Sequence, residues 1–292
     1  MAEKVTRSQC YPTTDPLLTQ TRKLLRQSAL RAKKGLGQNF LVDSEVLQLI
    51  VSAAGITPDD TIIEVGPGLG VLTRELAGQA RRVIAVELDS KLAAALNKTL
   101  AADNVTILNE DILHIAPASL TSGSFKVVAN LPYYITSPVL RHFLEAPVKP
   151  EAMIVMVQKE VARVIAAEPG HRSLLSISVQ FYGKPEIVSY VPAESFYPVP
   201  EVDSAILRID VYPRPTVAVT DEKSFFELVR AGFTASRKQL VNSLAQGLEF
   251  TKPEVLSLLE KAEISPQRRA ETLTLEEWVR LWQFFSNTGE ER

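Results

Sequence analysis

The chain has 292 residues, 46% of them hydrophobic and 23% charged, with a formal net charge of −2. This length allows one large domain and a smaller one, and no apolar run is long enough to cross a membrane. The single cysteine, Cys10, excludes an internal disulfide framework and cannot by itself build a thiolate metal site, so we expect no metal and a reducing, cytoplasmic environment.

Positive charge is concentrated near the N-terminus. Between Asp15 and Asp43 there is no acidic residue, and the basic residues there are Arg22, Lys23, Arg26, Arg31, Lys33 and Lys34. Such a segment attracts phosphates without reading base sequence, although a solvated basic tail is the simpler interpretation. We predict that residues 1–30 form a basic, weakly ordered extension, in which residues 17–30 can form a helix.

From residue 61 onward, short apolar strands alternate with helices. The strands are expected at 61–66, 82–88, 105–108, 125–131 and 152–157, and the helices at 71–80, 90–102 and 138–144. This alternation predicts an α/β fold with a mainly parallel sheet that is covered on both faces.

The pattern changes after residue 157. Helices are expected at 160–167 and 173–182, strands at 186–191 and 205–212, and further helices at 225–233, 238–246, 253–261 and 275–285. Pro213 and Pro215 indicate a linker. We therefore predict one α/β domain over residues 31–213 and a small helical domain over residues 214–292.

Three predicted strands end in residues that suit a nucleoside. The first is followed by Gly66-Pro-Gly68-Leu-Gly70, where glycines allow a tight turn and a close approach to a ligand. Glu87 ends the second strand, and its carboxylate can accept both ribose hydroxyls. Asp111, after the third, can reach the amino edge of an adenine. The G-x-G-x-G spacing favours S-adenosylmethionine over a nicotinamide cofactor.

The fourth predicted strand ends in Asn130-Leu131-Pro132-Tyr133. The exocyclic amine of adenine is a poor nucleophile because its lone pair is delocalised into the ring. The amide oxygen of Asn130 and the carbonyl of Leu131 can accept its two hydrogens, Pro132 can fix that carbonyl, and Tyr133 can stack on the base. A simple turn closing the strand is the alternative interpretation of these residues.

Together these motifs resemble the ribosomal RNA adenine dimethyltransferase family, and its small-subunit members most of all. The resemblance covers residue 32 to the C-terminus. It rests on Lys34-Gly-Leu-Gly-Gln-Asn-Phe-Leu41, Glu64-Val-Gly-Pro-Gly-Leu-Gly70, Glu87, Asp111, Asn130-Leu-Pro-Tyr133, Phe196-Tyr-Pro-Val-Pro-Glu-Val-Asp-Ser204 and Arg269-Ala-Glu-Thr-Leu273.

The resemblance implies a Rossmann-like S-adenosylmethionine-dependent methyltransferase sheet with a small C-terminal all-helical domain. It implies that Phe196 faces Tyr133 and that the two rings hold the target adenine. It also implies cofactor contacts at Asn39, Leu41, Gly66, Glu87, Asp111 and Asn130, to which the glycine loop adds Gly68.

The reaction implied by the resemblance is N6,N6-dimethylation of two adjacent adenosines in a hairpin near the 3′ end of 16S rRNA, during assembly of the small subunit, by a monomer. The basic pairs Arg237-Lys238 and Arg268-Arg269 suggest an RNA-facing edge in the helical region. Three alternatives stay open at this point: a 23S rRNA enzyme of the macrolide-resistance type, a non-enzymatic RNA-binding factor that keeps the fold, and a hydride-transferring enzyme.

Overall fold

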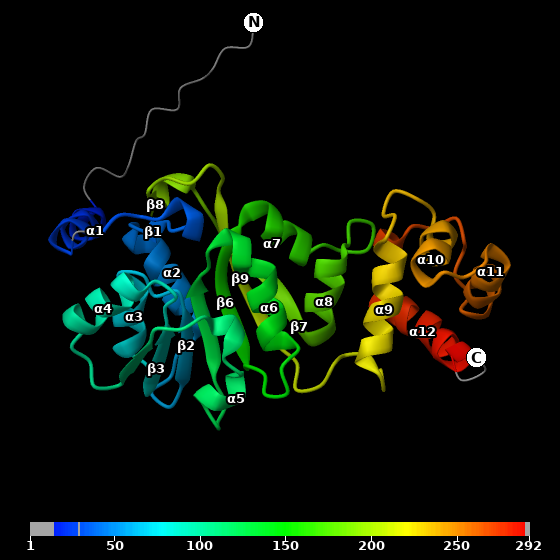
Figure 1. Cartoon of the computed structure of the whole chain (residues 1–292), viewed down its shortest axis with the longest axis horizontal. Helices are drawn as coiled ribbons and strands as arrows, with labels where there is room; N and C mark the ends of the chain where they lie inside the picture. Colours follow the sequence, from blue (N-terminus) through cyan, green and yellow to red (C-terminus); the bar gives the residue numbers. More distant parts are fainter. Residues whose placement is uncertain (1–14, 29, 290–292) are drawn as a thin grey trace, which may run out of the picture. The chain divides into compact units, whose positions relative to one another are not determined.

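The structure, a computed structural model, describes residues 15–28 and 30–289 (Figure 1). Contacts divide the chain into two compact units, Met1–Ala162 with Glu186–Asp210 and Arg163–Pro185 with Val211–Arg292. The second unit thus contains residues 163–185 in addition to the expected helical segment. The domain boundary expected at residue 213 stays a prediction.

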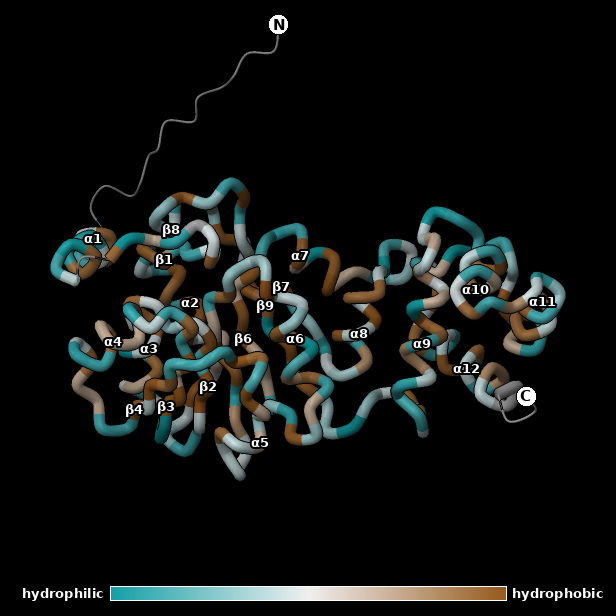
Figure 2. Tube along the Cα trace, in the orientation of Figure 1, coloured by the Kyte–Doolittle hydropathy of each residue, from teal (hydrophilic) through white to brown (hydrophobic). Residues whose placement is uncertain are grey.

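A seven-stranded sheet with the order β4-β3-β2-β5-β6-β9-β7 forms the centre of the first unit. The strands are β2 Thr61–Val65, β3 Arg82–Val86, β4 Val105–Leu108, β5 Lys126–Asn130, β6 Ala152–Gln158, β7 Gly183–Val191 and β9 Ser204–Val211. The strands from β2 to β6 are parallel, and β9 is antiparallel to β6. Every residue of β2 is buried, as expected for a strand covered on both faces, and apolar residues concentrate along the strands (Figure 2).

Aspartate side chains cap three helices of the first unit, α1, α2 and α4. The helices of this unit are α1 Pro16–Gln27, α2 Ser44–Ala54, α3 Val71–Ala77, α4 Ser90–Thr99, α5 Pro117–Leu120, α6 Thr136–Leu144 and α7 Lys159–Ile165, the last of which continues into the second unit. The sequence analysis missed α2, although Asp43 caps its first N–H groups and Gly55 ends it in a left-handed conformation.

A second, two-stranded sheet joins two distant segments of the first unit. β1 Phe40–Leu41 pairs antiparallel with β8 Phe196–Tyr197, and Leu41 lies opposite Phe196. Five short 3-10 helices complete the described elements: Lys34–Leu36, Ile112–His114, Tyr133–Ile135, Ala193–Ser195 and Ala270–Thr272.

The second unit is predominantly helical. Its helices are α8 Leu174–Tyr182, α9 Glu222–Phe233, α10 Leu240–Leu248, α11 Lys252–Lys261 and α12 Leu275–Gly289. Phe181 stacks on Phe225 with a centroid distance of 5.1 Å, and Gly232 lets the Trp278 ring approach α9, because a Cβ there would lie 2.3 Å from that ring. Within the described chain, no helix combines the length and the apolar character that a membrane span requires.

The helix expected within residues 17–30 is present at the N-terminal end of the described chain, in Asp15–Ser28. This segment contains α1, which buries Leu17, Leu18, Thr21 and Leu25. The Asp15 carboxylate caps α1 at the Leu17 N–H (2.8 Å) and accepts from the N–H (2.8 Å) and hydroxyl (2.9 Å) of Ser44 at the start of α2. The helix is therefore docked on the unit; residues 1–14 lie outside the described residues.

We expect Asp15→Ala to lower the free energy of unfolding by about 2 kcal/mol at pH 7, because it removes a cap and two tertiary hydrogen bonds. Burial opposes the ionisation of Asp15, but hydrogen bonds from Ser44 and Leu17 outweigh it and lower the pKa below 3.8. The stabilisation is therefore present above pH 3.8 and is lost as the pH falls further. Urea unfolding at pH 7 and pH 3 measures both effects, and Asp59→Ala, at an exposed position, is the control. Equal urea midpoints for Asp15→Ala and Asp59→Ala at pH 7 would contradict the role of Asp15 in docking α1.

Candidate active site

A cavity of about 320 Å³ lies in the first unit at the carboxyl ends of β2, β3 and β5. Parallel strands place their carboxyl ends at one edge of a sheet, which explains why residues far apart in the sequence meet there. All predicted site residues line this cavity: Asn39, Leu41, Gly66, Gly68, Glu87, Asp111, Asn130, Leu131, Pro132, Tyr133 and Phe196. Their placement agrees with the expectation, and their individual roles stay predictions.

The loop after β2 turns on its glycines. Gly66, Gly68 and Gly70 all have positive φ angles, of 70°, 57° and 75°, which residues with a side chain rarely adopt. A Cβ at Gly70 would lie 2.2 Å from Leu96 Cδ1 on α4. The loop therefore packs tightly against α4 at Gly70, and α3 begins directly after it.

Glu87 ties this loop to the end of β3. Its Oε2 accepts from the Gly68 N–H (3.0 Å) and its Oε1 from the Asp89 N–H (2.9 Å). Each carboxylate oxygen has a second lone pair, so the group can still accept a hydroxyl from a ligand. Burial raises the pKa of Glu87, and the backbone hydrogen bonds offset part of that rise.

Glu64 is a further cavity residue, to which the sequence analysis assigned no role. Its side chain is 1% exposed, and burial raises its pKa to about 8, with the neighbouring Glu87 adding to the rise and Thr73 and Arg74 offsetting part of it. Glu64 Oε2 and Thr73 Oγ1 both lack a partner with hydrogen-bond geometry among the described residues. An acidic residue inside an otherwise apolar strand was the signal that could have identified it.

Asn130 and Leu131 occupy the end of β5. The Asn130 side-chain amide donates to the Asn39 carbonyl (3.1 Å), which orients it with its oxygen available as an acceptor. The Leu131 N–H donates to the Met156 carbonyl (3.2 Å), so the peptide at the strand end is fixed by β6.

Tyr133 is held by a residue at the start of β9. Its hydroxyl lies 2.8 Å from the hydroxyl of Ser204, which is fully buried. Burial raises the pKa of Tyr133, so its hydroxyl is neutral at physiological pH. Ser204 is the last residue of the motif that begins at Phe196, and sequence reasoning gave it no role.

Phe196 lines the cavity and also belongs to the apolar core. The side chain is 1% exposed, and it packs in a cluster with Leu41 and Val191. The expectation that Phe196 and Tyr133 hold a base between them stays a prediction.

The segment before β1 lines the cavity with residues 36–39 and is tied to Asp89. Lys33 Nζ lies 2.7 Å from Asp89 Oδ2, and the Gln38 amide donates to the same oxygen (3.2 Å). Burial opposes the ionisation of Asp89, but these hydrogen bonds outweigh it and lower its pKa. This carboxylate thereby links the segment 33–41 to the end of β3 and to Glu87.

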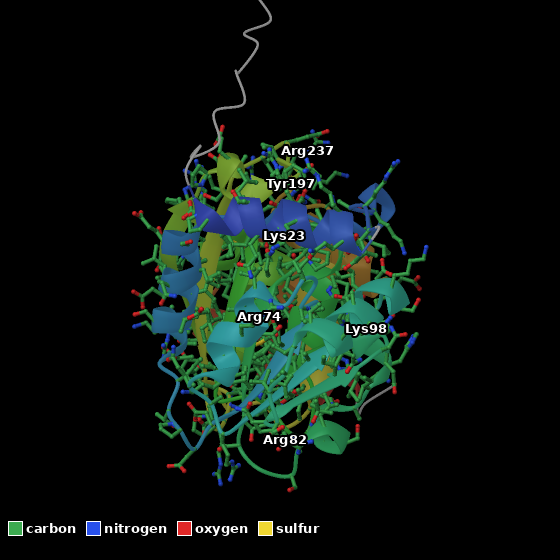
Figure 3. The ribbon with its side chains drawn as sticks, turned by 90° about the vertical axis from the view of Figure 1, so that its left-hand side faces the viewer. Lys23, Arg74, Arg82, Lys98, Tyr197 and Arg237 are labelled. Carbon is green, nitrogen blue, oxygen red and sulfur yellow. The ribbon has the colours of Figure 1, made fainter. Side chains whose placement is uncertain are left out.

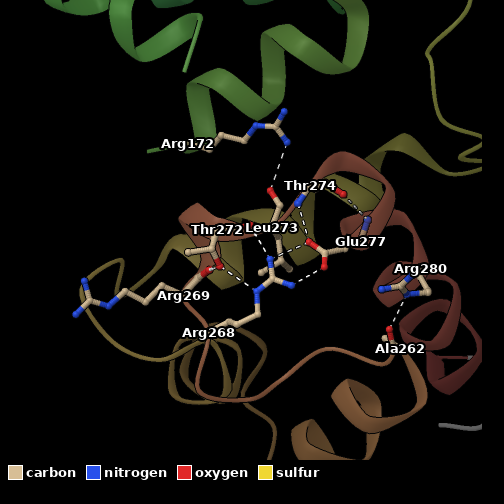
Figure 4. Close-up of polar contacts among 9 residues, drawn as sticks. All are labelled: Arg172, Ala262, Arg268, Arg269, Thr272, Leu273, Thr274, Glu277 and Arg280. Carbon is tan, nitrogen blue, oxygen red and sulfur yellow. Dashed lines mark hydrogen bonds and ion pairs between the residues drawn. The ribbon is translucent and has the colours of Figure 1, made fainter. Parts of the chain in front are cut away.

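The basic pairs of the second unit have different environments, and Figure 4 shows that of Arg268 and Arg269. Arg268 donates from both terminal nitrogens to the Glu277 carboxylate, one contact measuring 2.9 Å, and from Nη2 to the Thr272 carbonyl at 2.6 Å. The Arg268 guanidinium thus closes a turn within the unit, and the expectation that this pair faces RNA stays a prediction. The Arg269 side chain points away from this network and is 53% exposed, and Arg237 and Lys238 are exposed.

Comparisons with known proteins agree on one family. Residues 29–286 match the family described as "Ribosomal RNA adenine dimethylase". Ribosomal RNA small subunit methyltransferase A of Dehalococcoides mccartyi is 53% identical over 92% of this chain and 93% of that protein. The protein of the same name from Moorella thermoacetica is 44% identical over 89% and 94%.

Two solved structures share the fold. The 23S rRNA methyltransferase ErmE is 31% identical, with a TM-score of 0.68 over 85% of this chain and all of that chain. A dimethyladenosine transferase from Plasmodium falciparum has a TM-score of 0.73 at 24% identity, over 86% of this chain and 98% of that chain. The α/β methyltransferase architecture expected from the sequence is confirmed.

The buried Glu64 makes the stability of the protein depend on pH. Between pH 4.5 and 8 the unfolded chain ionises this carboxyl while the folded protein keeps it protonated, so folding loses up to about 1.4 kcal/mol per pH unit. We expect Glu64→Gln to match the wild type near pH 4.5 and to be increasingly more stable up to pH 8. Urea unfolding across this range tests it, with the exposed Glu151→Gln as control; parallel stability curves for wild type and Glu64→Gln would contradict the assignment.

Proposed function

Because the chain belongs to the ribosomal RNA adenine dimethylase family, we propose that it transfers methyl groups from S-adenosylmethionine to adenine amines of 16S rRNA. The observation that carries the proposal is the cavity in which the end of β5, Asn130–Tyr133, lies together with the glycine loop and Glu87. A nucleoside site and a site for an adenine amine thus share one pocket.

The residues present fit the methyl donor. Positive φ angles at Gly66 and Gly68 bring the backbone close to the cavity, Glu87 would accept the ribose hydroxyls and Asp111 the adenine amine, while Asn39 and Leu41 border the same space. The unpartnered oxygen of the buried Glu64 suits a cationic ligand, since a positive charge nearby favours the ionised carboxylate. When bound, the donor supplies a methyl group on a sulfonium, whose neutral thioether is a good leaving group.

The chain itself has to position and polarise the accepting amine. The Asn130 amide oxygen and the Leu131 carbonyl accept the two amine hydrogens, which returns lone-pair density to the nitrogen. Pro132 restricts the backbone that carries this carbonyl, and Tyr133 stacks on the base with Phe196 on its other side. Most of the rate enhancement then comes from proximity and preorganised acceptors.

The small subunit is the favoured substrate. The relatives that are 53% and 44% identical are named for the small subunit, whereas the 23S rRNA enzyme is 31% identical. The proposed targets are two adjacent adenosines in a hairpin near the 3′ end of 16S rRNA, in the subunit or its precursor. Action as a monomer in the cytoplasm is part of the proposal.

Labelled S-adenosylmethionine supplied with unmethylated small subunits, or with naked 23S rRNA, tests the substrate. We expect label on dimethyladenosine of 16S rRNA only, and label confined to 23S rRNA would overturn the choice.

Asn130→Ala should lower the rate of methyl transfer at least about 100-fold while retaining most RNA binding, because it removes one acceptor of the amine. Methylation by this variant at the wild-type rate would refute the role of Asn130.

Ser204 provides a test of ring positioning at Tyr133. We expect Tyr133→Phe and Ser204→Ala each to lower kcat by about three- to tenfold, because each breaks the 2.8 Å hydrogen bond, with little change in KM for the donor. The double variant should be no slower than the slower single variant, since the interaction can be lost only once. Fully multiplicative losses in single-turnover rates would show that the two residues act independently.

A further inference from the structure

The outward face of α1 carries positive charge that no acidic residue of the helix compensates. Lys23 and Arg26 are three residues apart, so they share one helix face, and both are exposed. The neighbouring Arg22 guanidinium lies 5.2 Å from the centre of the Tyr197 ring. Residues 16–27 include no aspartate or glutamate, so the helix itself offers Lys23 and Arg26 no acidic side chain to pair with.

α1 lies directly behind the wall of the cavity. Its Leu25 packs in a cluster with Phe40, Leu69 and Leu92, and these three residues also line the cavity. Tyr197 packs against the same cluster and follows Phe196 on β8. Figure 3 looks at this side of the molecule, where α1 crosses the first unit with Lys23 labelled on it. Positive charge is thus presented one layer of side chains away from the pocket.

The position of this charge is fixed by packing. Asp15 anchors the first turn of α1 to Ser44 of α2, and Leu17 reaches the main core of the unit. Cations on a docked helix keep a defined distance from the pocket, whereas those of a flexible tail would have to be ordered on binding. This rigidity distinguishes the face from a solvated basic tail.

We propose that the α1 face formed by Lys23 and Arg26 binds the phosphate backbone of the substrate RNA next to the adenine that enters the cavity. The proposal rests on the proposed function, because it takes the partner to be RNA. Extracting a base from its stack costs free energy, and phosphate contacts beside the pocket would offset part of this cost. Such contacts hold the strand without reading its sequence.

The test compares two variants that each remove two exposed cations from the first unit. Lys23→Gln/Arg26→Gln changes the α1 face. Arg82→Gln/Lys98→Gln is the matched control; Arg82 begins β3, at the opposite end of that strand from Glu87, and Lys98 lies in the last turn of α4 (Figure 3). Binding of fluorescently labelled 16S rRNA fragments is measured from 50 to 200 mM salt, together with methylation of unmethylated small subunits and calorimetric binding of S-adenosylhomocysteine.

We expect the α1 variant to bind RNA more weakly and its salt slope to be smaller by about 1.5, because two phosphate contacts are lost. The ratio of the wild-type RNA affinity to that of the α1 variant should therefore fall about tenfold between 50 and 200 mM salt. The control variant should match the wild type, Lys23→Arg/Arg26→Lys should restore the slope, and S-adenosylhomocysteine binding should be the same in all proteins.

The proposal would be overturned if Lys23→Gln/Arg26→Gln bound RNA with the affinity and salt slope of the wild type. It would also be overturned if the control variant lost as much RNA affinity as the α1 variant. Impaired methylation of small subunits with unchanged binding of naked RNA would also overturn it, because the face would then meet a ribosomal protein. A wild-type enzyme that methylates no small-subunit RNA would instead refute the proposed function, and the two failures are therefore distinguishable.

Discussion

The Glu87 carboxylate is the contact on which the rest of the site depends. It receives an N–H from Gly68 in the loop after β2 and another from Asp89 at the start of α4, so one buried group sets the spacing of two neighbouring strand ends. Asp89 extends the same network to Lys33 and Gln38 in the segment before β1. Three parts of the chain that are remote in sequence thereby border a single cavity.

This arrangement concentrates buried acidic groups, and their desolvation is costly. Burial raises the pKa of both Glu64 and Glu87, the charge of Glu87 adds to the rise at Glu64, and Glu64 has an oxygen without a partner among the described residues. A core built only for stability would replace such a group with an apolar one. A cationic ligand in the pocket would offset this cost, because its positive charge would favour the ionised form of the buried Glu64, whose oxygen has no partner among the described residues.

Much of the fold and most of the site residues were predictable from the sequence because their signals are local. An apolar run such as Thr61–Val65 reports burial on both faces, and glycines that follow it report a turn that side chains would block. Since parallel strands end at one edge, predicting the strands also predicted that Glu87, Asp111 and Asn130 would meet. The sequence by itself therefore determined the sheet, its ligand-binding edge and the residues there that suit a nucleoside.

Only the tertiary structure decided which distant side chains touch. The hydrogen bond between Tyr133 and Ser204, the docking of Asp15 on Ser44 and the pairing of Arg268 with Glu277 join residues whose local patterns say nothing about one another. The last of these gives a basic residue an acidic partner nine positions further along the chain. Local sequence patterns indicate whether a segment is buried and where the chain turns. The hydrogen-bond partner of a polar side chain depends instead on how separate segments pack, because each polar group bonds to the groups that the folded chain brings within reach.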